Sequence, residues 1–192
     1  MIIKSEEFLS CYLISMPQME DPRFSQTVSL LFQFDLQGAM ALVLNKETQI
    51  TLGQAFEGDP LSDHFSKRNL YWGGPVDNQQ LFILHDAPDL SEGIQLSEEL
   101  FLSSSVETLK ELDQRSSKGY SHFRLYSGYA GWGKGQLEEE ISQSSWLTAP
   151  LETHSLFDGS SQTLWKDVIK ASGIELSQLS SLDMNPDGKN IH

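Results

Sequence analysis

The segment 27–44 constrains the fold most, because it has the pattern of two strands joined by a turn of hairpin length. Apolar and polar side chains alternate from Thr27 to Phe34, which is typical of a strand buried on one face. The next four residues, 35–38, end in glycine, and the unbroken apolar run 39–44 follows. A short connection that contains glycine favours an antiparallel pair. We therefore expect an antiparallel hairpin over 27–44.

Further elements follow from shorter patterns along the chain. We expect five more strands, over 11–16, 70–72, 81–85, 120–129 and 146–149. We expect three helices, over about 52–56, 105–116 and 136–144. A last helix carries the apolar stripe Leu164, Trp165, Val168 and Ile169, with Ser161 as its N-cap and Gly173 just beyond its end.

The order of these elements indicates the fold class. Strands interspersed with single helices are typical of an α+β fold. The acidic segment 86–99 and the glycine-rich segment 128–135 are expected to be loops. Because 192 residues without a repeat or linker suggest one domain, we expect a single compact domain over 1–182 and a frayed polar tail over 183–192.

Charge and cysteine content exclude several classes of protein. The chain has 13 Lys and Arg against 27 Asp and Glu, a formal charge of −14, which argues against direct binding of nucleic acid or of an anionic membrane. Cys11 is the only cysteine, so a disulfide framework is impossible and a reducing compartment fits best. The N-terminus lacks an apolar leader, and the longest apolar run, 39–44, is far shorter than a membrane span. We expect a soluble, cytoplasmic protein.

Four segments together resemble a known bacterial family. They are 16–24 (MPQMEDPRF); 38–46 (GAMALVLNK); 73–76 (GGPV) with 82–85 (FILH); and 128–133 (GYAGWG) with 135–138 (GQLE), Glu140 and Trp146. In this order and spacing they are similar to the YqgE/AlgH family, over roughly residues 8–170. The resemblance implies a single α+β domain built around a curved, largely antiparallel sheet. One member is named as a regulator of alginate synthesis, a genetic label that specifies no reaction.

The chain also departs from the family pattern. Ala41 stands where glycine is usual, Glu47 where proline often follows, and Leu81 where glycine usually precedes the strand. Residues 77–80 lack the arginines often found there, and Lys134 replaces a common proline.

The glycine-rich segment matches the phosphate-loop pattern G-x-x-x-x-G-K over 128–134. However, Gly135 stands where Ser or Thr would hold Mg²⁺, and Glu138, Glu139 and Glu140 open the following helix. These carboxylates would repel a triphosphate. We therefore interpret the segment as a tight turn in which glycine lets aromatic side chains pack closely.

The remaining candidates for chemistry are isolated residues. His85 is a candidate acid or base, and Glu138 is a candidate partner that would orient it. Asp86 points to the opposite strand face from His85, so the two form no local dyad. No histidine has metal-ligand spacing, so we expect neither a metal site nor a cofactor, and Cys11 is expected to be a buried, inert thiol. Candidate binding residues are Asn45, Gly73, Gly74, Pro75, Tyr129, Trp132, Gly135 and Gln136.

These residues leave three classes of function open. The first is a non-enzymatic interaction or regulatory module without direct DNA binding, in which Tyr71, Trp72, Tyr129 and Trp132 form a recognition surface for a protein partner or a small ligand. The second is an enzyme whose site combines the 73–75 turn, His85 and the 128–136 segment. The third is a binder of a small anion or nucleotide at the start of the 136–144 helix.

Overall fold

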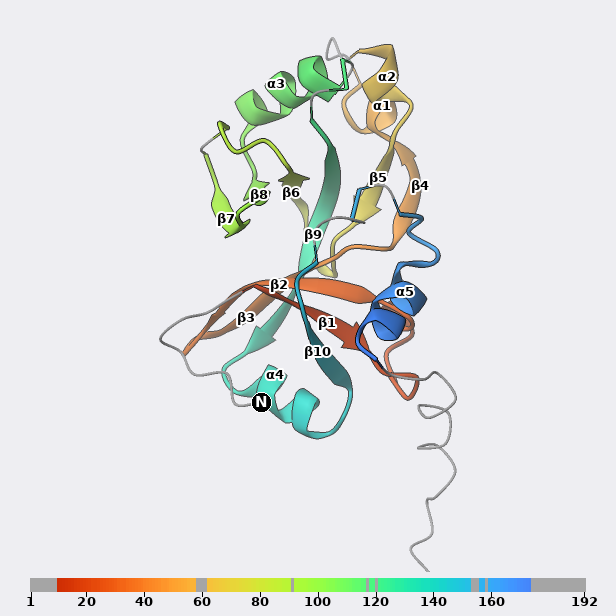
Figure 1. The fold of residues 1–192 in the computed structure, drawn as a ribbon, viewed down its shortest axis with the longest axis vertical. Helices are drawn as coiled ribbons and strands as arrows, with labels where there is room; N and C mark the ends of the chain where they lie inside the picture. Colours follow the sequence, from red (N-terminus) through yellow and green to blue (C-terminus); the bar gives the residue numbers. More distant parts are fainter. Residues whose placement is uncertain are drawn as a thin grey trace, which may run out of the picture.

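The computed structural model describes residues 10–57, 62–90, 92–116, 118–119, 121–152, 156–157 and 159–173. The fold is α+β, as the sequence predicts, with strands predominating (Figure 1). The strands are β1 Cys11–Ser15, β2 Val28–Asp35, β3 Gly38–Val43, β4 Glu47–Thr51, β5 Asn69–Trp72, β6 Val76–His85, β7 Ile94–Ser97, β8 Leu100–Ser103, β9 Phe123–Gly133 and β10 Trp146–Pro150. The helices are α1 Leu52–Ala55, α2 Asp63–Ser66, α3 Val106–Ser116, α4 Gln136–Ser142 and α5 Leu164–Ala171, with a 3₁₀ turn at Pro22–Phe24.

The long strand β9 organises the molecule, because it belongs to both halves of the sheet (Figure 1). Its first half lies between β6, which is antiparallel to it, and β5, which is parallel. Its second half pairs with β3, and the sheet continues through β2 and β1 to β10. On the other side the sheet continues from β6 through β8 to β7. Residues near one end of β9 therefore lie far from those near its other end.

The predicted hairpin is confirmed. β2 and β3 are antiparallel, and Asp35 lies opposite Gly38 across the turn. A register shift between Leu31 and Gln33 interrupts the ladder, which bends the strand locally. The hairpin therefore delivers β3 alongside the second half of β9.

Three buried apolar clusters fill the space around the sheet. The largest packs α5 residues such as Trp165 and Ile169 against β1 and β2. A second cluster packs Leu109 and Leu112 of α3 against Phe123 of β9. The third lies under α4, where Leu137 meets residues of β3, β9 and β10. Each half of the sheet is thus covered by its own helices.

Several sequence-based boundaries were wrong. The glycine-rich segment expected to be a turn is strand through Gly133, because β3 supplies hydrogen-bonding partners for 130–133. β6 begins at Val76 and not at residue 81, since Val76 already pairs with Tyr129 of β9, and the polar residues 77–80 form an irregular stretch between this pair and the pair of Leu81 with Ser127. The polar character of that stretch reflects its exposure.

Short elements were missed in segments expected to be loops. The acidic segment 86–99 contains β7, and β8 follows it directly. β4 and α2 lie in the polar region between β3 and β5. Ser161 is not the N-cap of α5; the cap position is Thr163, while Gly173 at φ +74° does follow the helix end.

Two further observations concern the limits of the described chain. The expected tail over 183–192, with His192, and also His154 lie outside the described residues. None of the helices in the described part combines the length and apolar character that spanning a membrane requires.

Candidate functional site

A hollow of about 380 Å³ lies beside the second half of β9, where α4, the 3₁₀ turn and the start of β10 meet. Three of the four segments that resemble the YqgE/AlgH family, which we call the family-like segments, contribute to its wall: 16–24, 73–76 and 128–146. We call this site the aromatic hollow. Its lining residues are Met19, Glu20, Asp21, Arg23, Phe24, Pro75, Ala130, Gly131, Trp132, Gln136, Glu140, Gln143, Ser145 and Trp146.

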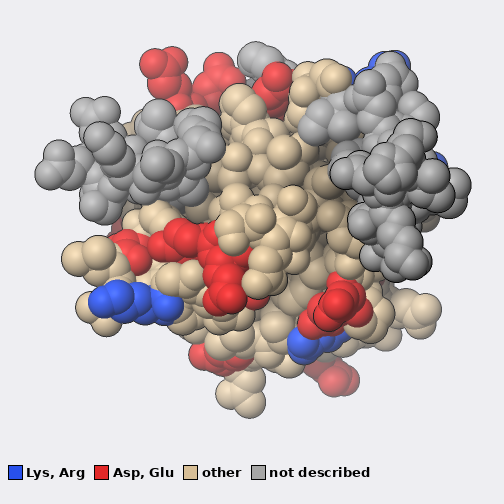
Figure 2. Space-filling model, turned by 90° about the horizontal axis from the view of Figure 1, so that it is seen from below, with Lys and Arg blue, Asp and Glu red and all other residues tan. Residues whose placement is uncertain are grey.

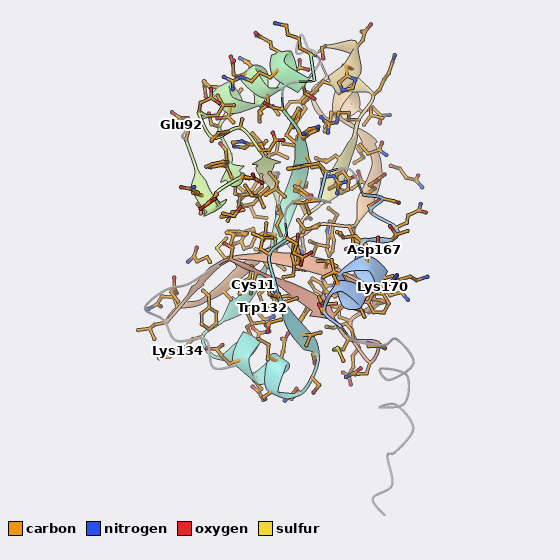
Figure 3. All side chains as sticks on the ribbon, viewed as in Figure 1. Cys11, Glu92, Trp132, Lys134, Asp167 and Lys170 are labelled. Atoms are coloured by element: carbon orange, nitrogen blue, oxygen red, sulfur yellow. The ribbon has the colours of Figure 1, made fainter. Side chains whose placement is uncertain are left out.

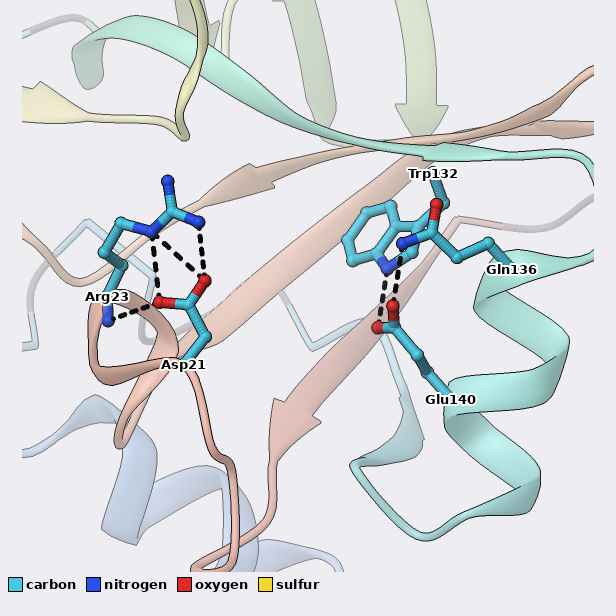
Figure 4. A network of polar contacts seen from close by, with 5 residues as sticks. All are labelled: Asp21, Arg23, Trp132, Gln136 and Glu140. Carbon is cyan, nitrogen blue, oxygen red and sulfur yellow. Dashed lines mark hydrogen bonds and ion pairs between the residues drawn. The ribbon is translucent and has the colours of Figure 1, made fainter.

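The Glu140 carboxylate fixes one wall of the aromatic hollow (Figure 4). Its Oε2 accepts hydrogen bonds from the indole N–H groups of Trp132 and Trp146, each at 2.8 Å. Its Oε1 accepts from the Gln136 amide at 2.9 Å, and Gln136 in turn accepts from the backbone N–H of Gly133 at 3.0 Å. This network locks the two indole rings 5.8 Å apart and nearly perpendicular.

The opposite wall carries an ion pair that is formed within the 3₁₀ turn (Figure 4). Asp21 caps the turn by accepting from the Arg23 backbone N–H at 3.0 Å, and it also binds the Arg23 guanidinium at 2.6 Å. The hydrogen bond from Arg23 lowers the pKa of Asp21. Phe24 at the end of the turn lies 5.6 Å from the Trp146 ring, edge to face. The turn thus presents an aromatic ring and a paired charge to the aromatic hollow.

Glycines allow two backbone segments to cross beneath the aromatic hollow. The Gly73 N–H donates to Ser127 O and its carbonyl accepts from Val43 N–H, each at 2.8 Å. A Cβ at Gly73 would lie 2.2 Å from the Gly128 carbonyl oxygen, and one at Gly74 would lie 2.0 Å from the Tyr129 carbonyl carbon. No side chain fits at these contacts. The glycines therefore serve close backbone approach, which places Pro75 at the hollow.

The structure brings some of the predicted binding residues together and separates others. Pro75, Trp132 and Gln136 line the aromatic hollow. Gly73 and Gly74 lie in the backbone crossing beneath it. The remaining candidates lie outside its lining and are Asn45, Tyr129 and Gly135.

These three residues have roles that their contacts define. Asn45 joins two loops, since its Oδ1 accepts from Val28 N–H at 3.0 Å and its Nδ2 donates to Gln26 O at 2.9 Å. Tyr129 packs edge to face on Phe82, with ring centroids 6.1 Å apart. Gly135 is the cap residue before α4 and has φ +76°.

His85 and Glu138 do not meet. His85 pairs with Phe123 at the first residue of β9, whereas Glu138 is exposed on α4, beyond the last residue of β9. Eleven residues of strand, on the order of 30 Å when extended, separate these ends. The structure therefore does not assemble the acid–base pair that the sequence suggested.

His85 itself is completely buried. Its ring stacks on Phe101 at 5.7 Å, and Nδ1 accepts a hydrogen bond from Ala87 N–H at 3.3 Å. Burial lowers its pKa, so the neutral ring is favoured. Asp86 binds His122 and not His85, at 2.7 Å.

The structure also shows the surroundings of Cys11 and of the side chains that could bind a metal ion. Cys11 is partly buried and packs with Trp132 in the apolar cluster under α4 (Figure 3). Burial raises the pKa of its thiol to about 11. Within the described ranges, no three His, Cys, Asp or Glu side chains are grouped so as to hold a metal ion.

Several residues of the aromatic hollow were not among the predicted site residues. Asp21, Arg23, Phe24, Glu140 and Trp146 all belong to the segments that carried the family resemblance. The signal that could have identified these residues is that they all belong to those segments. Spacing along the chain gave no indication, because the 3₁₀ turn and α4 lie far apart in the sequence and come together only in the fold.

Comparisons with known proteins identify the family of the chain. A family model described as AlgH-like matches residues 12–177. A protein of Paraburkholderia phymatum is 36% identical over 174 residues, covering 88% of this chain and 90% of its own, and one of Saccharophagus degradans is 34% identical over 181 residues, covering 91% and 88%. Both carry only the designation UPF0301 protein.

Solved structures show the same fold. The solution structure of the AlgH protein from Pseudomonas aeruginosa superposes with a TM-score of 0.71 at 31% identity and covers 100% of both chains. The crystal structure of protein DIP2367 from Corynebacterium diphtheriae has a TM-score of 0.70 at 22% identity, covering 93% of this chain and 94% of its own, which shows the fold alone. On the extent of the family match and the identity of these relatives, the chain belongs to the AlgH-like family.

Proposed function

We infer that this protein is a non-catalytic binding module that recognises a basic, partly apolar segment of another protein in the aromatic hollow. The observation that carries this inference is the convergence of three family-like segments, far apart in the chain, on one hollow of about 380 Å³. A concave, aromatic-lined site with a few fixed polar groups is the usual form of a recognition pocket.

The polar groups of the aromatic hollow support binding better than chemistry. Glu140 accepts three hydrogen bonds from two indoles and an amide, and Asp21 is paired with Arg23. Groups held in this way act as rigid features of a surface. Phe24, Trp132 and Trp146 add aromatic area, which is enriched at the centres of protein interfaces.

The charge of the hollow favours a basic partner. Glu20, Asp21 and Glu140 line it against the single cation Arg23 among its described lining residues. Acidic side chains outnumber basic ones on the face seen from below (Figure 2), which agrees with the net charge of −14. A Lys or Arg side chain can also lie over the partly exposed ring of Phe24, an attraction of about 0.5–1 kcal/mol. This charge balance disfavours nucleic acid as a direct partner.

The compartment follows from the cysteine content. A single cysteine favours the cytoplasm, where disulfides are rare.

A peptide selection tests the proposal. Random peptides would be selected on the immobilised protein, and the Kd of the enriched peptides would be measured by tryptophan fluorescence, since Trp132 and Trp146 both line the hollow. We expect enriched peptides that combine Lys or Arg with an apolar side chain. Phe24→Ala removes an aromatic wall residue and should weaken their binding about tenfold or more.

A control substitution separates this result from a general effect of truncating a surface side chain. Gln162→Ala changes an exposed residue that is outside the aromatic hollow and should leave Kd unchanged. Enriched peptides that are acidic, or that bind Phe24→Ala and wild type equally, would overturn the proposal. Failure to enrich any peptide over an unrelated acidic protein would do the same.

A further inference from the structure

A second cavity, of about 300 Å³, lies at the other end of β9 from the aromatic hollow. We propose that this basic cavity binds a doubly charged oxyanion of the phosphate class. It is walled by the start of β9, by β5 and the turn before it, and by Phe157. Its lining residues are Glu47, Leu52, Lys67, Arg68, Asn69, Tyr71, Phe123, Arg124, Leu125 and Phe157.

Arg124 is the most buried charge of the basic cavity. It is 7% exposed, and its guanidinium lies 5.1 Å from the Tyr71 ring centroid. One terminal nitrogen donates to the carbonyl oxygens of Phe157, at 3.3 Å, and Gly159, at 3.0 Å. These acceptors are neutral dipoles, so they orient the guanidinium without neutralising it. The Glu47 carboxylate in the same cavity feels the charge of Arg124 but forms no ion pair with it. A buried charge that lacks a paired counterion is costly.

Arg68 brings a second guanidinium to the same basic cavity. Its central carbon lies 4.4 Å from the Phe123 ring centroid, and one terminal nitrogen donates to the Phe123 carbonyl oxygen. Burial, reinforced by the nearby charge of Arg124, lowers the pKa of Arg68. Among the described residues, neither arginine forms an ion pair with a carboxylate. Two guanidinium groups thus share one cavity in a strongly acidic protein.

Glu47 limits the charge of the basic cavity without cancelling it. Its Oε1 accepts from Ser161 at 2.6 Å and from Tyr71 at 2.9 Å, and its Oε2 accepts from Asn69 at 3.1 Å. These bonds, that from Ser161 foremost, lower the pKa of Glu47, so it remains ionised at neutral pH. Lys67, Arg68 and Arg124 against Glu47 leave two positive charges among the described lining residues.

Two positive charges match the charge of a phosphate group near neutral pH, about −1.5 to −2. Guanidinium groups bind such tetrahedral oxyanions through paired N–H donors, which favours arginine over lysine at these sites. The aromatic rings of Tyr71 and Phe157 add an apolar wall that suits a phosphate ester with an organic group. The proposal does not depend on the aromatic hollow, because the two sites share no lining residue.

The test is a titration followed by ¹H–¹⁵N NMR at constant ionic strength, with inorganic phosphate, phenyl phosphate and succinate as separate probes. We expect inorganic phosphate to shift the amide signals of residues 67–71 and 123–125 in a saturable way. Phenyl phosphate should bind more tightly than inorganic phosphate because it also contacts the rings. Succinate, a dicarboxylate of the same charge, should bind more weakly than either.

Variants connect the signals to the basic cavity. Arg68→Gln should weaken phosphate binding about tenfold, since it removes one of the two guanidinium groups. Lys67→Gln, at an exposed position that keeps the fold intact, should weaken it by a smaller factor of about three. Lys134→Gln makes the same charge change beyond the far end of β9 (Figure 3) and should leave Kd unchanged.

Three results would overturn the proposal. One is a shift that stays linear in phosphate concentration up to high millimolar levels. Another is an equal loss of binding in Lys67→Gln and Lys134→Gln, which would indicate general charge attraction. The third is tighter binding of succinate than of both phosphates, which would exclude the phosphate class.

Discussion

Replacing Gly73 by alanine should destabilise the protein strongly. The new Cβ would lie 2.2 Å from the Gly128 carbonyl oxygen and 2.7 Å from Cδ1 of Leu42. Ordinary contacts begin near 3.4 Å, so one of the crossing backbones would have to move by about 1 Å. The backbone at Gly73 resists this movement because its hydrogen bonds to Ser127 and Val43 hold it in place. We expect a loss of about 3 kcal/mol in the free energy of unfolding, the upper end for overpacking.

Gly131→Ala is the matched control. Neither Gly73 nor Gly131 has a positive φ, so both substitutions differ only in the space available. A Cβ at Gly131 would meet side-chain atoms of Tyr129 at 3.3 Å and Val76 at 3.7 Å, and these can give way. We expect a change within about 0.5 kcal/mol.

Urea unfolding followed by circular dichroism measures the difference. With a slope of about 2 kcal/mol per molar urea, the Gly73→Ala midpoint should fall about 1.5 M below wild type, while that of Gly131→Ala stays close to it. Midpoints that agree within about 0.3 M for the two variants, at equal slope, would refute the reasoning that Gly73 is required for the backbone crossing.

Three further predictions concern single side chains. Glu140→Gln should cost about 2 kcal/mol of unfolding free energy, because the new amide group must face either the two indole N–H groups or the Gln136 amide; a urea midpoint equal to wild type would contradict this. Burial lowers the pKa of His85 from 6.5, so below that pH the unfolded state binds more protons than the folded state, and the free energy of unfolding should fall as the pH drops below 6.5. The urea midpoints at pH 7.5 and 5.5 should therefore differ less in His85→Phe than in wild type. An equal difference in the two proteins would show that His85 is not the cause. The pKa of the Cys11 thiol, raised from 9.0 to about 11, should lower its thiolate fraction about a hundredfold, so a disulfide reagent at pH 7.5 should react far faster in urea than with the folded protein; equal rates would count against burial of this thiol.

The sequence predicted the fold class and the hairpin well, because both depend on local patterns. Alternation over 27–34 and a short turn ending in Gly38 specify β2 and β3 with little contribution from the rest of the chain. Apolar spacing located α3 and the apolar stripe of α5 in the same way.

Elements set by distant partners were predicted poorly. Residues 130–133 contain two glycines and were expected to turn, yet they are strand because β3 lies beside them. β4 was missed because it is largely exposed and pairs only with β5, so its sequence has no apolar alternation. Local propensity carries no information on such pairings.

The candidate site was predicted in part for the same reason. Pro75, Trp132 and Gln136 were recognised and do line the aromatic hollow. Glu140 was not singled out, because its role depends on two indole N–H groups that come from different strands, β9 and β10. The pairing of His85 with Glu138 was suggested by residue type alone, and the length of β9 separates the two.

The most direct measurement of the central claim is a ¹H–¹⁵N spectrum of the indole N–H groups during titration with a selected basic peptide. Trp132 and Trp146 donate these groups to Glu140 at the wall of the aromatic hollow, whereas Trp165 donates to Ser15 O in the buried core. If the family-like segments form a recognition surface, the signals of Trp132 and Trp146 shift in a saturable way while that of Trp165 stays in place. Saturable binding that leaves Trp132 and Trp146 unchanged would contradict the account.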